Sequence, residues 1–261
     1  CVPAKGAAFL CPVQYSPNKN IILPTESINF EVSNSSPHTN AMLKHWWKAL
    51  GALLVLYGII YGLAMNVPKL DILNETIRNV FFHVPMWFTM TVLFVISVYY
   101  AIMYLAKNDL KYDIWSSQLI KTGLYFGCLG MLTGMLWARS TWGAFWSNDP
   151  KQVMTLLSML IYFAYVVLRT SITDLEKRAR ISAVFNVFAF ALMIPLIWIL
   201  PRLTESLHPG TGGDNPAFGK MAPELSIVFR PVAIGWILMG LWIATLFIRT
   251  EIIKYKKQEL L

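Results

Sequence analysis

The sequence contains little charge and little cysteine, and each shortage excludes a class of protein. Asp, Glu, Lys and Arg make up only 14% of its 261 residues, whereas a soluble domain carries about 25%. The three cysteines, Cys1, Cys11 and Cys128, form no C-x-x-C motif, so a disulfide framework, a cysteine zinc site and covalent cofactor attachment through paired thiols are not indicated. Because 56% of the residues are hydrophobic and the charge-free stretches are long, the composition indicates a membrane protein.

The net charge of +8 does not indicate a nucleic-acid-binding protein. The basic residues are scattered between apolar runs and form no extended basic patch. We assign this charge to loops on the cytoplasmic side of a membrane, where Lys and Arg accumulate. The ten tryptophans and eleven tyrosines are typical of the aromatic belts at the two membrane surfaces. We therefore expect contact with membrane lipid and none with nucleic acid.

The N-terminal segment has neither the basic start nor the apolar core of a signal peptide. Residues 1–41 are polar and rich in Pro, Asn and Ser, and the first methionine is Met42. We expect residues 1–41 to be a non-native or disordered segment. Residues 42–261 then form a single membrane domain.

Six stretches are long and apolar enough to predict transmembrane helices. Such a helix needs about 20 mostly apolar residues, and its backbone must satisfy its hydrogen bonds internally. The predicted spans cover about residues 46–66, 84–106, 118–138, 152–169, 181–201 and 231–249. The predicted fold is therefore all-α, a polytopic membrane protein with six transmembrane helices.

The basic residues between the spans predict the orientation of the chain. If the N-terminus is cytoplasmic, the inner connections and the tail Lys254-Tyr255-Lys256-Lys257 hold more Lys and Arg than the outer connections do. Positive charge accumulates on the cytoplasmic side, so we expect both termini to be cytoplasmic. The first, third and fifth connections then lie together on the outer side of the membrane.

Two of the four histidines, His83 and His208, fall in different outer connections. His83 precedes Val84-Pro85 at the start of the second span, and His208 lies in the fifth connection. A six-coordinate haem needs two axial donors on opposite faces of the ring, and neutral imidazole is a suitable donor. The two histidines could supply this pair, or each could only anchor its own loop. No histidine lies inside a predicted span, so a haem b buried within the membrane is not supported.

The third connection is unusually rich in aromatic residues. Trp137, Trp142 and Trp146 occur within ten residues of one another, together with Gly143 and Asp149. An aromatic belt is the simpler explanation, but belts place only one or two such residues at a helix end. Flat indoles can cover a macrocycle and exclude water, and glycine permits close approach of the backbone. The segment therefore favours an aromatic platform for a flat ligand.

Three basic residues in the outer connections could pair with haem propionates. These are Arg78, Arg139 and Lys151, and arginine offers two parallel hydrogen bonds to a carboxylate. Each could equally be an ordinary cation at the membrane surface. Asp149 could cap the fourth span, or it could hold a loop or a partner.

The segment Trp142-Gly143-Ala144-Phe145-Trp146-Ser147-Asn148-Asp149-Pro150-Lys151 resembles the tryptophan-rich signature of the haem-handling family of cytochrome c biogenesis. Together with Arg78-x4-His83-Val84-Pro85 and Leu207-His208, it is most similar to the haem exporter protein C (CcmC) members of this CcmC, CcmF and CcsA group, from about Met42 to the C-terminus. Two positions depart from the pattern. Asn148 stands where the last tryptophan of W-G-x-x-W-x-W-D is expected, and Gln152 replaces an acidic residue of some members.

The resemblance implies a haem-delivery protein of the bacterial inner membrane that works on its periplasmic face and has no catalytic turnover. It implies non-covalent haem b, with His83 and His208 as axial ligands of the iron. The implied platform is Trp137, Trp142, Gly143, Trp146 and Asp149. The implied partners are a periplasmic haem chaperone (CcmE-like), ABC transporter subunits (CcmA/CcmB-like) and a small single-span protein (CcmD-like).

Two alternatives remain open at this stage. A CcsA-like cytochrome c synthase would attach haem to apocytochrome directly, although such relatives carry histidines inside their spans. A haem transporter would need a polar path between the spans, and few ionisable residues lie within them. The Gly-rich stretch before Lys220 lacks the G-x-x-x-x-G-K-[ST] motif of a P-loop, so any ATP hydrolysis would come from another subunit.

Overall fold

A computed structural model describes residues 37–68, 73–208 and 221–258, with side chains from Lys44 onward. Its helices are α1 Pro37–Ala64, the 3-10 helix η1 Asn74–Asn79, α2 Val80–Lys107, α3 Leu110–Trp142, α4 Pro150–Ser171, α5 Leu175–Met193, the π-helix η2 Ile194–Ile199, α6 Leu200–Leu203 and α7 Pro223–Lys257. The described residues form no strand. The all-α prediction is confirmed.

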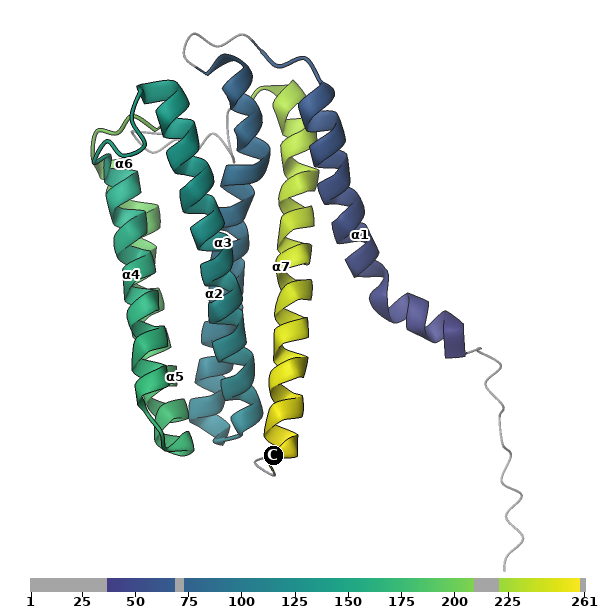
Figure 1. Ribbon diagram of the computed structural model, residues 1–261, viewed down its shortest axis with the longest axis vertical. Helices are drawn as coiled ribbons and strands as arrows, with labels where there is room; N and C mark the ends of the chain where they lie inside the picture. The colour runs from purple at the N-terminus through teal and green to yellow at the C-terminus, as the bar shows by residue number, and fades with distance from the viewer. Residues whose placement is uncertain (1–36, 69–72, 209–220, 259–261) are drawn as a thin grey trace, which may run out of the picture.

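Six helical stretches within the described residues are long and apolar enough to cross a membrane, as predicted. They run as a bundle of roughly parallel and antiparallel rods, in which α1 lies outermost and packs mainly on α7 (Figure 1). The division of the chain at Met42 stays a prediction, and α1 itself begins at Pro37.

The helices extend beyond the predicted apolar spans because hydropathy marks only the part that lies in hydrocarbon. The second stretch begins at Asn74 instead of residue 84, so His83 lies inside α2 and not in a loop before it. The third runs over Leu110–Trp142 and the sixth over Pro223–Lys257. A helix continues into polar surroundings as long as its end groups find partners. The expectation that no histidine lies within a span is therefore wrong for His83, and also for His45, which the first stretch, Lys44–Ala64, includes.

Aspartate caps fix the starts of three helices. Asp109, Asp149 and Asp174 precede α3, α4 and α5, and each carboxylate accepts a hydrogen bond from a backbone N–H in the first turn. Such a cap satisfies one of the N–H groups that a helix start leaves without a partner. The cap that Asp149 forms confirms one of the two roles expected for that residue.

A stripe of glycines lets α3 approach α2 closely. Gly123, Gly127, Gly130 and Gly134 lie one turn apart on α3, and a Cβ atom on them would lie within 2.8 Å of Phe94, Met90, Trp87 and His83 of α2, respectively. Small residues at a helix interface permit the close packing on which helix association in a membrane depends. The stripe ends at His83, so the same packing that joins the two helices positions this histidine.

The outer faces of the helices are apolar. Side chains such as Leu53, Ile60, Leu132, Val167 and Ile234 are more than half exposed. A surface with so many exposed apolar side chains is unfavourable in water but matches hydrocarbon. The chain is therefore a multi-pass membrane protein.

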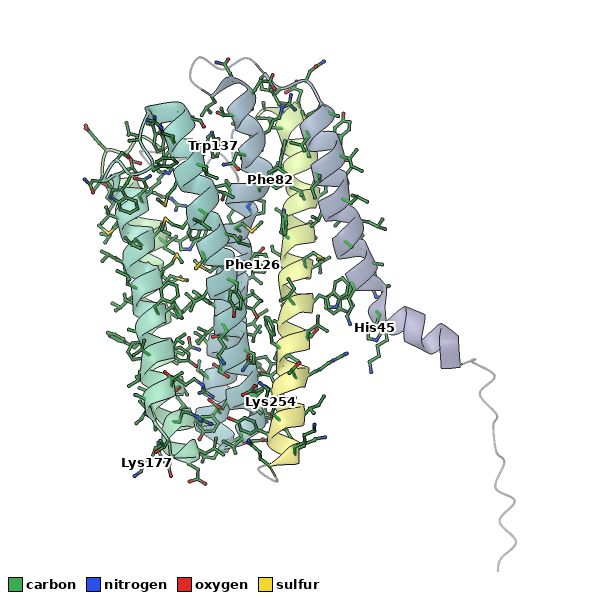
Figure 2. All side chains as sticks on the ribbon, viewed as in Figure 1. His45, Phe82, Phe126, Trp137, Lys177 and Lys254 are labelled. Atoms are coloured by element: carbon green, nitrogen blue, oxygen red, sulfur yellow. The ribbon has the colours of Figure 1, made fainter. Side chains whose placement is uncertain are left out.

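The helix ends define two ends of the bundle. The end of α1, the start of α2, the end of α3, the starts of α4 and α7, and α6 gather at one end, which we call the site end (Figure 1). Trp137 lies near this end, whereas Lys177 and Lys254 lie at the opposite, C-terminal end (Figure 2). The first, third and fifth connections therefore adjoin the same end, as predicted. The side of the membrane that this end faces stays a prediction.

Candidate functional site

A cavity at the site end is lined by both of the histidines that the sequence singled out. Together with the solvent space at its mouth, it contains about 1020 Å³. Its walls come from α2, α3, α4, η2, α6 and the segment after α6, through His83, Val84, Trp87, Phe88, Gly130, Met131, Gly134, Met135, Lys151, Gln152, Thr155, Ile197, Trp198, Arg202 and His208. The lining is mainly apolar, with a few polar groups that converge on the space.

His83 is held one turn into α2 by contacts that fix its tautomer. Its Nδ1 lies 2.9 Å from the carbonyl oxygen of Gly130 on α3. A carbonyl can only accept, so Nδ1 carries the proton and donates, and Nε2 keeps its lone pair. The indole N–H of Trp87 lies 3.4 Å from Nε2. A ligating histidine likewise donates from one ring nitrogen to a fixed acceptor, and a metal would take the Nε2 lone pair, which here accepts the long hydrogen bond from the Trp87 N–H.

His208 is held in the equivalent way by Asp149. The His208 Nδ1 lies 2.8 Å from Oδ1 of Asp149, across 59 residues of sequence. The same carboxylate accepts from the Ser206 hydroxyl at 2.8 Å and from the Leu207 N–H at 2.7 Å. Asp149 therefore does two things at once: it caps α4, and it binds the segment after α6 to the tryptophan-rich connection. The second role, in which Asp149 holds a loop, was also predicted from the sequence.

The surroundings of this pair lower the pKa values of both Asp149 and His208. Burial raises the pKa of Asp149, but the hydrogen bond from Ser206, the electrostatic interaction with the His208 ring and the N–H groups of Leu207 and Lys151 outweigh it, so the pKa is lowered overall. Burial lowers the pKa of His208 below its ordinary value of 6.5, against the opposing effect of Asp149. A neutral imidazole that donates through Nδ1 has Nε2 available for a metal.

The three tryptophans of the predicted platform do not line the cavity, and two of them pack against the histidines instead. Trp137 contacts the His83 ring edge to face, with centroids 5.8 Å apart, and donates a hydrogen bond to Thr76. Trp142 packs against His208 in the same manner at 4.7 Å. Trp146 donates to Asn148 at 2.7 Å. Two of the indoles therefore support the imidazoles, and a direct contact of all three with a ligand stays a prediction.

Gly143, Asn148 and Gln152 shape the tryptophan-rich connection between α3 and α4. Gly143 ends α3 with φ +81° and Asn148 has φ +55°, a left-handed conformation that glycine and asparagine adopt most readily. Gln152 accepts from the N–H and hydroxyl of Ser147 at 3.0 and 3.1 Å. A carboxylate at position 152 could accept the same two bonds, so the replacement preserves the turn.

The predicted propionate partners occupy different places. Arg78 donates to the carbonyls of Gly62 and Met65 at 3.0 and 2.8 Å and pairs with Glu75, which ties the end of α1 to η1. Arg139 donates to the Gly143 carbonyl and lies over the Phe145 ring. Only Lys151 of the predicted set lines the cavity.

Several lining residues were not predicted from the sequence. Trp87 and Trp198 supply the indoles on the cavity wall, and Arg202 adds a cation that lies 5.6 Å above the Trp198 ring. Trp198 belongs to the π-helix η2, which contains Pro195. Short π-helical segments within helices often occur at functional sites. Pro195, inside the fifth predicted span, is the sequence feature that could have indicated this departure from a regular helix.

The donor set of the cavity fits a haem. The two imidazoles could provide axial nitrogens, indole and aliphatic side chains an apolar surface, and Lys151 and Arg202 cations for carboxylates. A model of one protein family, described as Heme exporter protein C, matches residues 29–261. The chain belongs to this family.

Known relatives extend the likeness beyond the family. The Heme exporter protein C of Bradyrhizobium diazoefficiens is 25% identical over 215 residues, which cover 82% of this chain and 81% of that protein. The cytochrome c biogenesis protein CcsA of Cuscuta reflexa is 32% identical over 104 residues, or 40% of this chain and 32% of its own length. CcsA of Heterosigma akashiwo is 26% identical over 66% of this chain and 56% of its own length. The heme exporter family thus matches along the whole membrane domain, while CcsA matches in part.

Proposed function

We propose that this protein binds haem b non-covalently between His83 and His208 and delivers it during cytochrome c biogenesis. The observation that carries the proposal is that both histidines line one cavity while each Nδ1 is bonded to a fixed acceptor. This leaves Nε2 of each ring as the nitrogen for iron. Membership of the heme exporter protein C family supports haem as the ligand.

The contacts around each histidine suggest how haem is kept and released. His83 belongs to the long helix α2 and packs against α3, whereas His208 belongs to a short segment joined to Asp149 by a few hydrogen bonds. A ligand on a segment with few buried contacts opens at a lower free energy than one within a packed core. His208 is therefore the ligand that exchanges first when haem passes to an acceptor.

The acceptor in this proposal is a periplasmic haem chaperone, and the site end faces the periplasm of the bacterial inner membrane. The excess of Lys and Arg at the other end supports that orientation. The proposed complex also contains ABC transporter subunits and a small single-span protein. The chain itself performs no catalytic turnover, because the site offers two ligands and a binding surface.

Absorption spectra of the purified protein test the ligands. Replacing His83 or His208 with Gly should convert a low-spin, six-coordinate haem to a five-coordinate one, and added imidazole should restore the low-spin spectrum by filling the vacated space. His45→Gly, in α1 away from the cavity, is the matched control and should leave the spectrum unchanged. A normal low-spin spectrum in the His83→Gly/His208→Gly variant without imidazole would refute the ligand assignment.

The match to CcsA favours one alternative, a component of a direct cytochrome c synthase. The position of His83 within α2 removes one argument against it, since this histidine lies in a helical span. Incubating the haem-loaded protein with apocytochrome and, separately, with a haem chaperone distinguishes the two. Covalent haem on apocytochrome in the absence of any other subunit would favour the synthase.

A further inference from the structure

A second cavity opens at the C-terminal end of the bundle, opposite the site end that holds His83 and His208. It contains about 830 Å³ of open space, including its mouth, between α3, α4, α5 and α7. Most of its lining side chains carry a polar or charged group, Val166 is the one aliphatic side chain among them, and no histidine lines it. A flat apolar macrocycle is a poor match for such walls, so this is not a second copy of the haem site.

Four cations line this cavity, and two of them have carboxylate partners. Arg169 forms two hydrogen bonds with Asp113, at 2.7 and 2.6 Å. Lys254 pairs with Glu251 at 3.3 Å. These two pairs are neutral overall, so they leave the charge of the cavity to the remaining cations.

The other two cations, Lys121 and Arg178, have no carboxylate within 4.0 Å in the part of the chain that the structure describes. Arg178 donates to the Tyr255 hydroxyl at 2.8 Å, but its buried Nε–H has no partner among those residues. Lys121 is half-buried and makes no hydrogen bond there. Unpaired charge is costly away from water, and an ionisable residue within a membrane helix usually marks a functional site. Among the described residues, the cavity therefore has a surplus of two positive charges.

The surroundings of the cavity select a lipid over a free anion. Arg178 lies in the first turn of α5 and Lys254 in the last turn of α7, so the cavity lies where the helices leave the hydrocarbon. Exposed apolar side chains, Val167 and Ile253, are next in sequence to the lining residues Val166 and Lys254. Basic pockets between membrane helices on the cytoplasmic side bind anionic headgroups. We propose that this cavity binds the phosphate of an anionic phospholipid headgroup, through Lys121 and Arg178.

Lipid binding to the purified full chain tests the proposal. Native mass spectrometry in detergent should show phosphatidylglycerol retained on the wild type and phosphatidylcholine not retained. Each basic residue near a membrane surface contributes about 1 kcal/mol to the attraction of anionic lipid, so Lys121→Gln/Arg178→Gln should weaken phosphatidylglycerol binding about 30-fold. Lys177→Gln is the matched control, because Lys177 lies exposed at the same end and outside the cavity lining.

The outcomes separate the alternatives. Equal weakening by Lys177→Gln would mean that only the general charge of this end matters, and would overturn the proposal. If inorganic phosphate at millimolar concentration displaces the lipid completely, the ligand is a free phosphate and the lipid assignment is wrong. Wild-type protein that retains both lipids equally would refute the proposal even if the double variant does not fold. None of these results depends on haem binding.

Discussion

The hydrogen bonds around Asp149 predict a specific effect of replacing it with Asn. All the partners of its carboxylate are donors: the N–H groups of Lys151 and Leu207, the Ser206 hydroxyl and His208 Nδ1. An amide has only one oxygen, so its NH₂ group must face at least one donor and leave that donor without an acceptor. The side chain would still cap α4, since Asn is as good a cap as Asp.

The expected loss is in haem affinity. Removing the partner that orients a metal-binding histidine typically costs 10- to 100-fold in affinity, which is about 1.4–2.7 kcal/mol. Asp149→Asn should therefore raise the Kd for haem by one to two orders of magnitude in an absorbance titration. It should also shift the spectrum toward five-coordinate iron as His208 loses its fixed tautomer.

Asp109→Asn is the matched control for this measurement. Asp109 caps α3 with a hydrogen bond to the Lys111 N–H at 2.9 Å, so one amide oxygen is enough there. It should bind haem as the wild type does. An Asp149→Asn protein with wild-type Kd and a low-spin spectrum would refute the claim that Asp149 positions His208.

The remaining predictions concern packing, pH and a buried ion pair. A Cβ on Gly134 would lie 2.5 Å from the His83 ring, whereas one on Gly127 would meet the flexible side chain of Met90. Gly134→Ala should therefore lose low-spin haem and about 1–3 kcal/mol of stability. Gly127→Ala should keep the spectrum. Because the pKa of His208 is lowered from 6.5, the neutral ring and its contribution to stability are fully present above pH 6.5 and are lost as the pH falls below 6.5. Haem occupancy, measured by absorbance, should therefore be constant from pH 8 to 6.5. Loss of half the haem above pH 6.5 would contradict this. Asp113→Asn leaves the Arg169 charge buried without its partner, which should cost about 3–5 kcal/mol of stability and lower the melting temperature in detergent. Asp113→Leu/Arg169→Met removes both charges and should restore most of that stability. An equal loss in both variants would refute a stabilising role of the ion pair.

Much of the fold could be predicted because membrane helices are specified locally. Each span is a run of apolar residues whose backbone bonds close within the run, so composition over about 20 residues is enough. Alternation then brings the first, third and fifth connections to one end, and this placed His83, the tryptophan-rich segment and His208 together before any contact was known. The ends of the spans were less certain, because capping by Asp109 and Asp149 extends helices past the apolar run.

Other features arise only when the helices pack. Asp149 meets His208 across 59 residues and Asp113 meets Arg169 across 56, and nothing in either local sequence names the partner. The cavity wall takes Trp87 and Trp198 because α2 and η2 turn those faces inward, whereas Arg78 is drawn to the end of α1.

The sequence by itself therefore determined the class of protein, the number of spans and the pair of histidines, since hydropathy and alternation are properties of the chain. The tertiary structure alone decided which nitrogen of each imidazole donates to a fixed acceptor and which side chains surround the ring, because hydrogen bonds and packing depend on which atoms approach within a few ångströms across helices.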